Sequence, residues 1–375
     1  MEHIAIDLGT VQSQICRRSE RGEILEEVRV PTRELENYLK GRAKARVIVE
    51  TCSEAFNVAD EVMTLGHEIR VVPSRLAPSL GVGSHGIKTD RRDAQKLSEA
   101  SVRMDLGSVH IPSKENRERK AVCALRDALV KARTQLVNSA RGYLRTRRIL
   151  LPSGKVSSFP GRVRKRTAAE PQGMPMALER QLAVIEALNK QIAAADEELT
   201  QMAEQDATCQ LLMTMPGVGP LTSILFAATI DDLKRFPNGH RMESYLGLTP
   251  GENSSSMRKQ STSITKAGPT RLRWVLGQAA WSLWRTRPND PLVRWANEVA
   301  KRRGKKVAVV ALERRMAGVL RAMWRDSKPY DAAMAVPAPV RLPPEVEAKR
   351  AAGMKATALA KAKGNHLKVV SYTNS

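Results

Sequence analysis

The chain has 375 residues, of which 42% are hydrophobic, so it is long enough for two or three domains with sizeable cores. Its 62 Lys and Arg residues outnumber 39 Asp and Glu residues, and the net charge of +23 favours a polyanionic partner such as nucleic acid. No apolar run approaches the roughly 20 residues of a membrane-spanning helix and the N-terminus lacks a signal-peptide charge pattern, so we expect a cytoplasmic protein without a membrane partner.

The first 111 residues alternate short apolar runs with helical stretches. A meander of three strands is predicted first, and because a helix separates the next two strands, we expect those two to be parallel. This order predicts an α/β domain of the RNase H-like class. The strands are predicted at residues 4–7, 11–17, 24–30, 47–50 and 68–72, and the helices at residues 35–39 and 56–65.

Four acidic residues accompany these elements. Asp7 and Glu50 each end an apolar strand, whereas Asp90 and Asp93 lie three residues apart at a predicted helix start and so project from one helical face. One interpretation is structural, with Thr89 or Asp90 capping the helix and Asp93 complementing its dipole. The two strand-ending acids favour another, in which four carboxylates converge at one sheet edge as oxygen ligands for Mg²⁺ or Mn²⁺.

Asp7 alone is ambiguous, because a strand followed by Asp-Leu-Gly-Thr also opens the phosphate loop of actin-like ATPases and sugar kinases. The rest of the chain lacks a second strand-plus-glycine phosphate signature and an adenosine-binding Gly-Gly stretch. This difference favours a metal-dependent nuclease site over a kinase site.

Residues 112–206 have a different pattern. Apolar residues recur at steps of three and four from Val122 to Tyr143 and again from Leu182 to Met202, which predicts an antiparallel helical hairpin with coiled-coil spacing. Residues 150–172 between them are expected to form an exposed connection. The hairpin can be a purely structural stalk, but its many cations favour contact with nucleic acid. The nucleic-acid-binding candidates here are Arg133, Arg141 and Arg145.

Pro216-Gly-Val-Gly219 separates two apolar helical segments and predicts a turn like that of a helix-hairpin-helix motif. Gly217 and Gly219 could present backbone N–H groups to a phosphate, or they could serve close packing of the helices. The sequence leaves both interpretations open.

The last patterned block begins at Gly247-Leu-Thr-Pro250 and continues with three serines. Serine clusters are common in loops, but cations that could hold a phosphate follow this one. Trp274, Trp281 and Trp284 recur at helical spacing and are predicted to be core residues. The serines are Ser254, Ser255 and Ser256, and the candidate cations are Arg258, Lys259, Lys266, Arg271 and Arg273.

Taken in order, these motifs resemble the DEDD transposases of bacterial insertion sequences, the IS-one-ten family or bridge recombinases. The resemblance runs from about residue 4 to residue 325. It implies a RuvC-like DEDD catalytic domain at 1–111, a coiled-coil hairpin at 112–206 and a mainly α C-terminal transposase domain with a helix-hairpin-helix-like turn at 207–328. The composition of residues 329–375, which are rich in Ala and Pro and then basic and poorly apolar, predicts a flexible basic tail.

The resemblance also implies residue roles. The family's metal-binding tetrad falls on Asp7, Glu50, Asp90 and Asp93, and its nucleophilic serine, the fifth residue after the proline of Gly-Leu-Thr-Pro, falls on Ser255. Family members usually have glycine after that serine, whereas this chain has Ser256, so Ser254 and Ser256 remain alternatives.

The implied activity is a recombinase that cleaves and rejoins DNA, guided by a structured RNA of the element. Its implied partners are donor and target DNA and the guide RNA, at the bacterial nucleoid. Because a stalk with coiled-coil spacing can pair protomers, we also expect a homo-oligomer, a dimer or tetramer. Two alternatives remain: a metal-dependent junction nuclease that does not rejoin strands, and a non-catalytic nucleic-acid-binding protein.

Overall fold

The computed structural model describes residues 1–80, 89–168, 173–252 and 261–333. The chain divides into two compact units. Unit 1 holds residues 1–188 together with 227–231, and unit 2 holds residues 189–226 and the chain from 232 onward. Within the described ranges, no helix is long and apolar enough to cross a membrane.

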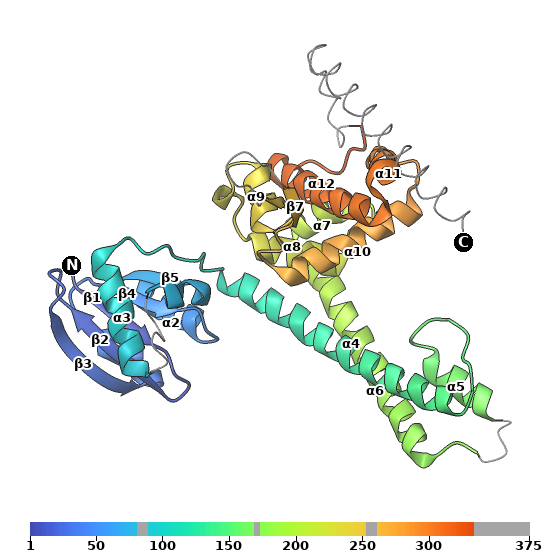
Figure 1. The fold of residues 1–375 in the computed structure, drawn as a ribbon, viewed down its shortest axis with the longest axis horizontal. Helices are drawn as coiled ribbons and strands as arrows, with labels where there is room; N and C mark the ends of the chain where they lie inside the picture. Colours follow the sequence, from blue (N-terminus) through green and yellow to red (C-terminus); the bar gives the residue numbers. More distant parts are fainter. Residues whose placement is uncertain (81–88, 169–172, 253–260, 334–375) are drawn as a thin grey trace, which may run out of the picture. The chain divides into compact units, whose positions relative to one another are not determined.

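Unit 1 begins with a mixed sheet of order β3-β2-β1-β4-β5 (Figure 1). β1, β2 and β3 form an antiparallel meander, whereas β4 is parallel to β1 and β5 is parallel to β4. The predicted meander and parallel pair are therefore confirmed, and the topology is compatible with an RNase H-like fold. The strands are β1 (His3–Asp7), β2 (Gln12–Arg18), β3 (Ile24–Pro31), β4 (Arg46–Glu50) and β5 (Glu68–Val72).

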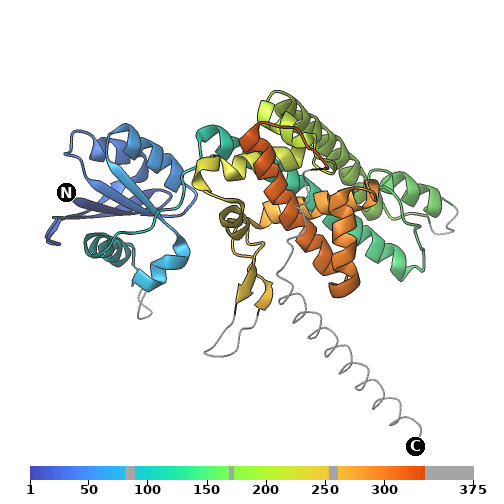
Figure 2. The same cartoon turned by 90° about the horizontal axis from the view of Figure 1, so that it is seen from above.

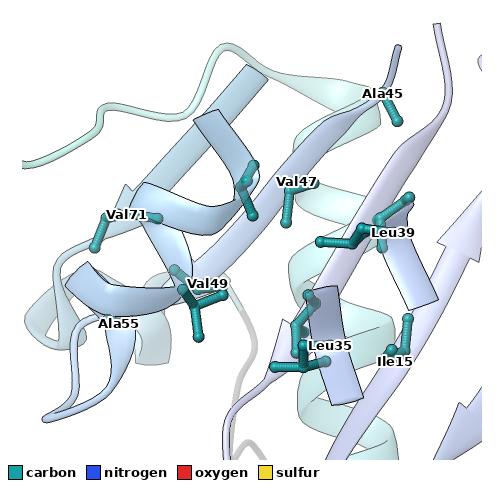
Figure 3. Close-up of a cluster of buried hydrophobic side chains, with 13 residues drawn as sticks. Ile15, Leu35, Leu39, Ala45, Val47, Val49, Ala55 and Val71 are labelled. Carbon is teal, nitrogen blue, oxygen red and sulfur yellow. The ribbon is translucent and has the colours of Figure 1, made fainter. Parts of the chain in front are cut away.

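Helices cover both faces of this sheet. α1 (Leu35–Leu39) and α2 (Ala55–Thr64) pack on one face, where Val47 and Val49 of β4 belong to a fully buried cluster (Figure 3). α3 (Asp90–Arg103) packs on the other face. Because successive side chains of a strand alternate between faces, each strand residue can be assigned to the α1–α2 face or to the α3 face.

The helical part of unit 1 corrects one prediction. Residues 150–172 are not only an exposed connection, since they include α5 (Phe159–Thr167), in which Phe159 and Val163 are fully buried. These two apolar residues lie four apart, so they share one helical face and pack with Leu144 of α4 and Leu182 of α6. The neighbouring helices are α4 (Lys114–Thr146) and α6 (Met176–Glu204).

Asp231, which follows the last residue of α8 (Pro220–Ile230), binds the start of α4 through hydrogen bonds. Its carboxylate accepts hydrogen bonds from Asn116 Nδ2 at 2.5 Å and Ser113 Oγ at 2.9 Å, and it lies 2.5 Å from His110 Nε2. Burial alone would raise the pKa of Asp231, but these hydrogen bonds outweigh it and lower the pKa to about 2.

Unit 2 is mostly helical. Its core is formed chiefly by α10, α11 and α12, and a short antiparallel pair of strands, β6 and β7, projects from it (Figure 2). Its elements are α7 (Ala207–Met213), α9 (Gly239–Tyr245), β6 (Pro250–Glu252), β7 (Ser261–Ile264), α10 (Thr270–Thr286), α11 (Pro291–Arg303) and α12 (Lys305–Asp326).

The prediction that three tryptophans of α10 belong to the core is wrong for Trp274, whose exposed fraction is 55%. The buried stripe of α10 follows Leu272, Val275, Leu276, Ala279 and Leu283 instead, and Trp274 lies outside it. Trp281 and Trp284 are partly buried and contact each other, with Lys305 Nζ 5.3 Å and 5.6 Å from the two ring centroids. The structure also places Pro329 to Ala333 among the described residues, while the rest of the predicted tail, 334–375, lies outside them.

Candidate active site

Asp7 and Glu50 end adjacent parallel strands, β1 and β4. The last paired residues of β1 and β4 are Ile6 and Val49, and both belong to the core on the α1–α2 face. Because side chains alternate along a strand, the next residue of each strand turns to the α3 face. Asp7 and Glu50 are therefore neighbours on the face that α3 covers.

α3 runs back along β1, so its first turn reaches the same end of the sheet. The far end of α3 is held where Ser101 Oγ lies 2.7 Å from His3 Nδ1. Four residues of strand from His3 to Asp7 span roughly 13 Å, and eight residues of helix from Ser101 to Asp93 span roughly 12 Å. Asp93 therefore lies at about the level of Asp7, and its exposed fraction is only 3%.

Asp90 has a different environment. Thr89 caps α3 by accepting a hydrogen bond from the Arg92 backbone N–H, which confirms the structural interpretation for Thr89. The Asp90 carboxylate lies 3.1 Å from the Arg29 guanidinium of β3, in an ion pair with both side chains more than half exposed. Such a pair contributes little stability, so Asp90 can leave Arg29 at low cost. The sequence did not indicate Arg29.

A second contact fixes the start of α3 on β3. The Glu27 carboxylate accepts hydrogen bonds from Arg91 and Gln95 of α3, each with a shortest distance of 2.5 Å. These hydrogen bonds lower the pKa of Glu27, the one from Arg91 most strongly. The helix turn that carries Asp90 and Asp93 is thus docked on the sheet by two separate polar contacts.

The donor set suits a divalent cation, since carboxylate oxygens are the ligands that Mg²⁺ and Mn²⁺ prefer. Asp7 and Glu50 end neighbouring strands at one sheet edge, and the position of α3 puts Asp93 at about the same level along β1. In the described ranges, however, no three His, Cys, Asp or Glu side chains are close enough to hold one ion. The chemistry of the donor set therefore fits a divalent cation, and Asp7 and Glu50 also fit by their position on neighbouring strands.

The serine motif belongs to unit 2. β6 and β7 pair antiparallel, with Pro250 opposite Ile264 and Glu252 opposite Ser261. Residues 253–260 join these strands, so the predicted residues Ser254, Ser255, Ser256, Arg258 and Lys259 lie outside the described residues. The structure thus describes the support of the serine segment but not the segment itself.

Two glycines hold the base of this hairpin together. Gly247 has φ +70°, and a Cβ there would lie 2.6 Å from the Ala267 carbonyl oxygen, while one on Gly268, at φ +133°, would clash with the Tyr245 carbonyl oxygen. Only glycine adopts these conformations without strain and allows this approach. The Gly-Leu-Thr-Pro and Lys-Ala-Gly motifs are therefore two sides of one packed junction.

The predicted phosphate-binding cations of this region differ in their surroundings. Lys266 is exposed at the junction with φ +56°, and its backbone N–H donates to the Gly247 carbonyl at 3.1 Å. Arg273 donates to the Leu246 carbonyl at 3.0 Å, where it supports the end of α9. Arg271 is partly buried on α10. Phosphate binding by these three residues stays a prediction.

The other predicted nucleic-acid contacts are also placed. Gly217 has φ +89°, and a Cβ there would lie 2.5 Å from the Ala279 carbonyl oxygen of α10, which supports the packing interpretation for this glycine. Gly219 faces open space. On α4, Arg145 is exposed, Arg133 is partly buried, and the Arg141 guanidinium lies 5.6 Å from the centroid of the Phe159 ring.

Glu313 of α12 is a buried acid that the sequence did not single out. Its exposed fraction is 6%, and its Oε1 atom has no hydrogen-bond partner within the described part of the chain. Across the helix interface lies Gly277 of α10, where a Cβ would be 3.6 Å from Glu313 Oε2. Burial raises the pKa of Glu313 to about 7, although the positive charge of Arg273 opposes the shift.

Glu313→Gln is expected to stabilise the protein at high pH. An acid whose pKa rises on folding contributes its full stability below the unfolded pKa, near 4.5, and loses it as the pH approaches 7. At pH 8 the free energy of unfolding of the variant should therefore exceed that of the wild type by about 2–3 kcal/mol, and at pH 5 the difference should be much smaller. Urea unfolding at both pH values measures this difference, and hydrogen exchange in α12 shows whether it arises there. Glu298→Gln, at an exposed position, is the control. Equal gains at both pH values would contradict it.

Two family models match the chain. One, of the DEDD type and described as Transposase, matches residues 4–147, which include the four acids. The other, described as Transposase IS116/IS110/IS902 family, matches residues 209–293, which include the glycine turn and the β6–β7 hairpin. The two matched segments hold both halves of the site predicted from the sequence.

Curated relatives align along most of the chain. The transposase for insertion sequence element IS1111A of Coxiella burnetii is 28% identical over 87% of this chain and 90% of its own length. The transposase for IS1328 of Yersinia enterocolitica is 27% identical over 84% and 94%, and a probable family 20 transposase of Pseudomonas aeruginosa is 26% identical over 86% and 96%. One model matches the segment with the four acids and the other matches the segment with the glycine turn and the hairpin. This chain is therefore a member of the IS110 family of DEDD insertion-sequence transposases.

Proposed function

We propose that this transposase cleaves and rejoins DNA under the guidance of a structured RNA, with a RuvC-like carboxylate site and a serine nucleophile. The observation that carries the proposal is the register of α3, which brings Asp93 to the sheet edge of Asp7 and Glu50. Asp90 completes the tetrad after it leaves Arg29. Mg²⁺ or Mn²⁺ bound to these oxygens would stabilise negative charge on the reacting phosphate.

The serine accounts for rejoining. Attack by Ser255 Oγ forms a bond to phosphorus while one phosphodiester P–O bond breaks, and the released hydroxyl group takes a proton as the serine loses one. The resulting phosphoserine ester conserves the bond energy, so a DNA hydroxyl can later displace the serine without a separate ligase. The tight junction at Gly247 and Gly268 supports this role by fixing the base of the hairpin that carries the serine.

The guide RNA is proposed from charge. A net charge of +23 exceeds what solubility requires, and cations line the long helix α4. Structured RNA is bound largely through its shape and phosphates, so retention should fall steeply with salt. RNA that copurifies at moderate salt and is sequenced would identify the guide.

Ser255→Ala is expected to abolish the covalent protein–DNA product, because no other group replaces the missing hydroxyl. Wild-type protein with its RNA should give a denaturant-resistant adduct, and mass spectrometry of the nuclease-treated adduct should place the phosphate on Ser255. Ser254→Ala and Ser256→Ala serve as matched controls from the same segment and should retain the adduct. Adduct loss in either control instead would move the nucleophile. Wild-type cleavage without any adduct would favour the junction nuclease.

A further inference from the structure

A pocket in unit 2 is not used by the proposed chemistry. It has a volume of about 570 Å³, within the usual range for ligand sites, and lies among α9, α11 and α12. Its lining includes the uncharged α12 residues Ala311, Gly318, Val319 and Ala322. The other lining residues are His240 and Glu243 of α9, Trp295 of α11, and Arg314 and Arg315 of α12.

The two arginines of the pocket differ in their pairing. Arg314 is held by Glu243, with 2.5 Å between the charged groups, and its guanidinium lies 3.3 Å from His240 Nδ1. Arg315 is partly buried and forms no ion pair with an acid of the described chain, and its guanidinium lies 4.6 Å from the Trp295 ring centroid. Burial lowers the pKa of Arg315, while the charge of Glu243 opposes the shift.

An unpaired, partly buried guanidinium is costly, since buried cations are usually matched by acids. Among the described residues that line the pocket, the one carboxylate is Glu243, and it is already paired with Arg314 and His240. The pocket therefore has one positive charge more than its acids neutralise, together with several N–H donors. This arrangement suits an anionic ligand.

The side chains of the pocket favour one class of anionic ligand, a nucleotide. A guanidinium stacked on an indole offers in-plane donors to phosphate oxygens, and flat bases stack readily on aromatic and guanidinium planes. The pocket has Trp295 in its lining, and its volume of about 570 Å³ is large enough for such a base.

We propose that this pocket binds one nucleotide of a single-stranded nucleic acid, with its phosphate on Arg315 and its base beside Trp295. The inference rests on the proposed function only in that the protein handles nucleic acid. RNA and DNA share this chemistry, and the experiment separates them.

The test uses full-length protein and fluorescent single-stranded oligonucleotides, one of RNA and one of DNA, that carry 5-bromouracil. Arg315→Gln should weaken binding about tenfold, equivalent to about 1.4 kcal/mol, and should lower the salt dependence by about one phosphate contact. Arg303→Gln removes the same charge at the exposed end of α11 and should weaken binding less than about twofold. The oligonucleotide that binds more tightly shows whether the pocket takes a nucleotide of RNA or of DNA.

Photocrosslinking reports which residue the base contacts, and a loss of non-specific charge attraction would not change that residue. Irradiation of the wild-type complex should yield a crosslinked peptide containing Trp295, and Trp295→Phe should remove it while the variant keeps its circular dichroism spectrum and melting temperature. Equal weakening by Arg315→Gln and Arg303→Gln, or crosslinks only elsewhere, would overturn the pocket assignment. Displacement by millimolar inorganic phosphate with no base crosslink would also overturn it, in favour of a phosphate site. A wild-type protein that binds neither oligonucleotide nor its own RNA would instead reject the proposed function.

Discussion

Asp93→Asn is expected to reduce DNA strand cleavage at least roughly a hundredfold while folding and nucleic-acid binding change little. The substitution keeps the size of the side chain but removes the negative charge that would bind a divalent cation. Asp93 is 3% exposed at the end of the sheet where β1 and β4 end in Asp7 and Glu50, so its carboxylate is the buried member of the predicted tetrad on α3. Asp7→Asn should have the same effect for the same reason.

The measurement is cleavage of donor DNA by the RNA-loaded protein over a range of Mg²⁺ and Mn²⁺ concentrations. Asp105→Asn is the matched control, since Asp105 lies just beyond α3 and is 80% exposed in an ion pair with Arg70. Isothermal titration with Mn²⁺ should show weaker binding for Asp93→Asn but not for Asp105→Asn. Wild-type rates for Asp93→Asn in Mg²⁺ would show that the tetrad assignment is wrong.

The carboxylate site shows what the sequence could predict. Short apolar runs predicted the strands, and the acids at the ends of two of them placed Asp7 and Glu50 at one edge because parallel strands end together. The spacing of Asp90 and Asp93 gave their common helical face. The direction of α3 along β1 and the ion pair with Arg29 depend on contacts between distant residues, which no local pattern encodes.

Three other features of the structure could not be predicted from the sequence because they also depend on tertiary packing. Phe159 and Val163 stand among prolines, glycines and arginines, so the composition of 150–172 concealed the buried face of α5. Trp274 was assigned to the core by its spacing, but the buried stripe of α10 runs through its aliphatic residues. Glu313 and Arg315 look like ordinary charged residues of an amphipathic helix, and only the packing of α12 against its neighbours distinguishes them.

The carboxylates belong to unit 1 and the serine hairpin to unit 2. α4 alone has 33 residues, equivalent to about 50 Å at 1.5 Å per residue. Leu125 of α4 is 69% exposed and Val184 of α6 is 50% exposed. These apolar side chains are available to a partner helix, so we expect a homo-oligomer, a dimer or tetramer paired through this stalk, in which Ser255 of one chain meets the acids of another.

Mixing Asp7→Asn protein with Ser255→Ala protein should therefore restore part of the activity that each variant lacks alone. In a randomly exchanged dimer half of the molecules are mixed, and each mixed dimer has one intact composite site, so about a quarter of the wild-type sites should return. Covalent protein–DNA product should reappear, and it should carry only the Asp7→Asn chain, which still has Ser255. Size-tagged subunits make that assignment on a denaturing gel.

The matched control is a mixture of Asp7→Asn with Asp93→Asn. It exchanges subunits in the same way but never assembles a complete tetrad, so it should remain inactive. Mass photometry of the tagged proteins would verify that mixed oligomers form in both mixtures. If mixed oligomers of Asp7→Asn and Ser255→Ala form but stay inactive, the site is built within one chain, because only assembly in trans can combine the acids of one variant with the serine of the other.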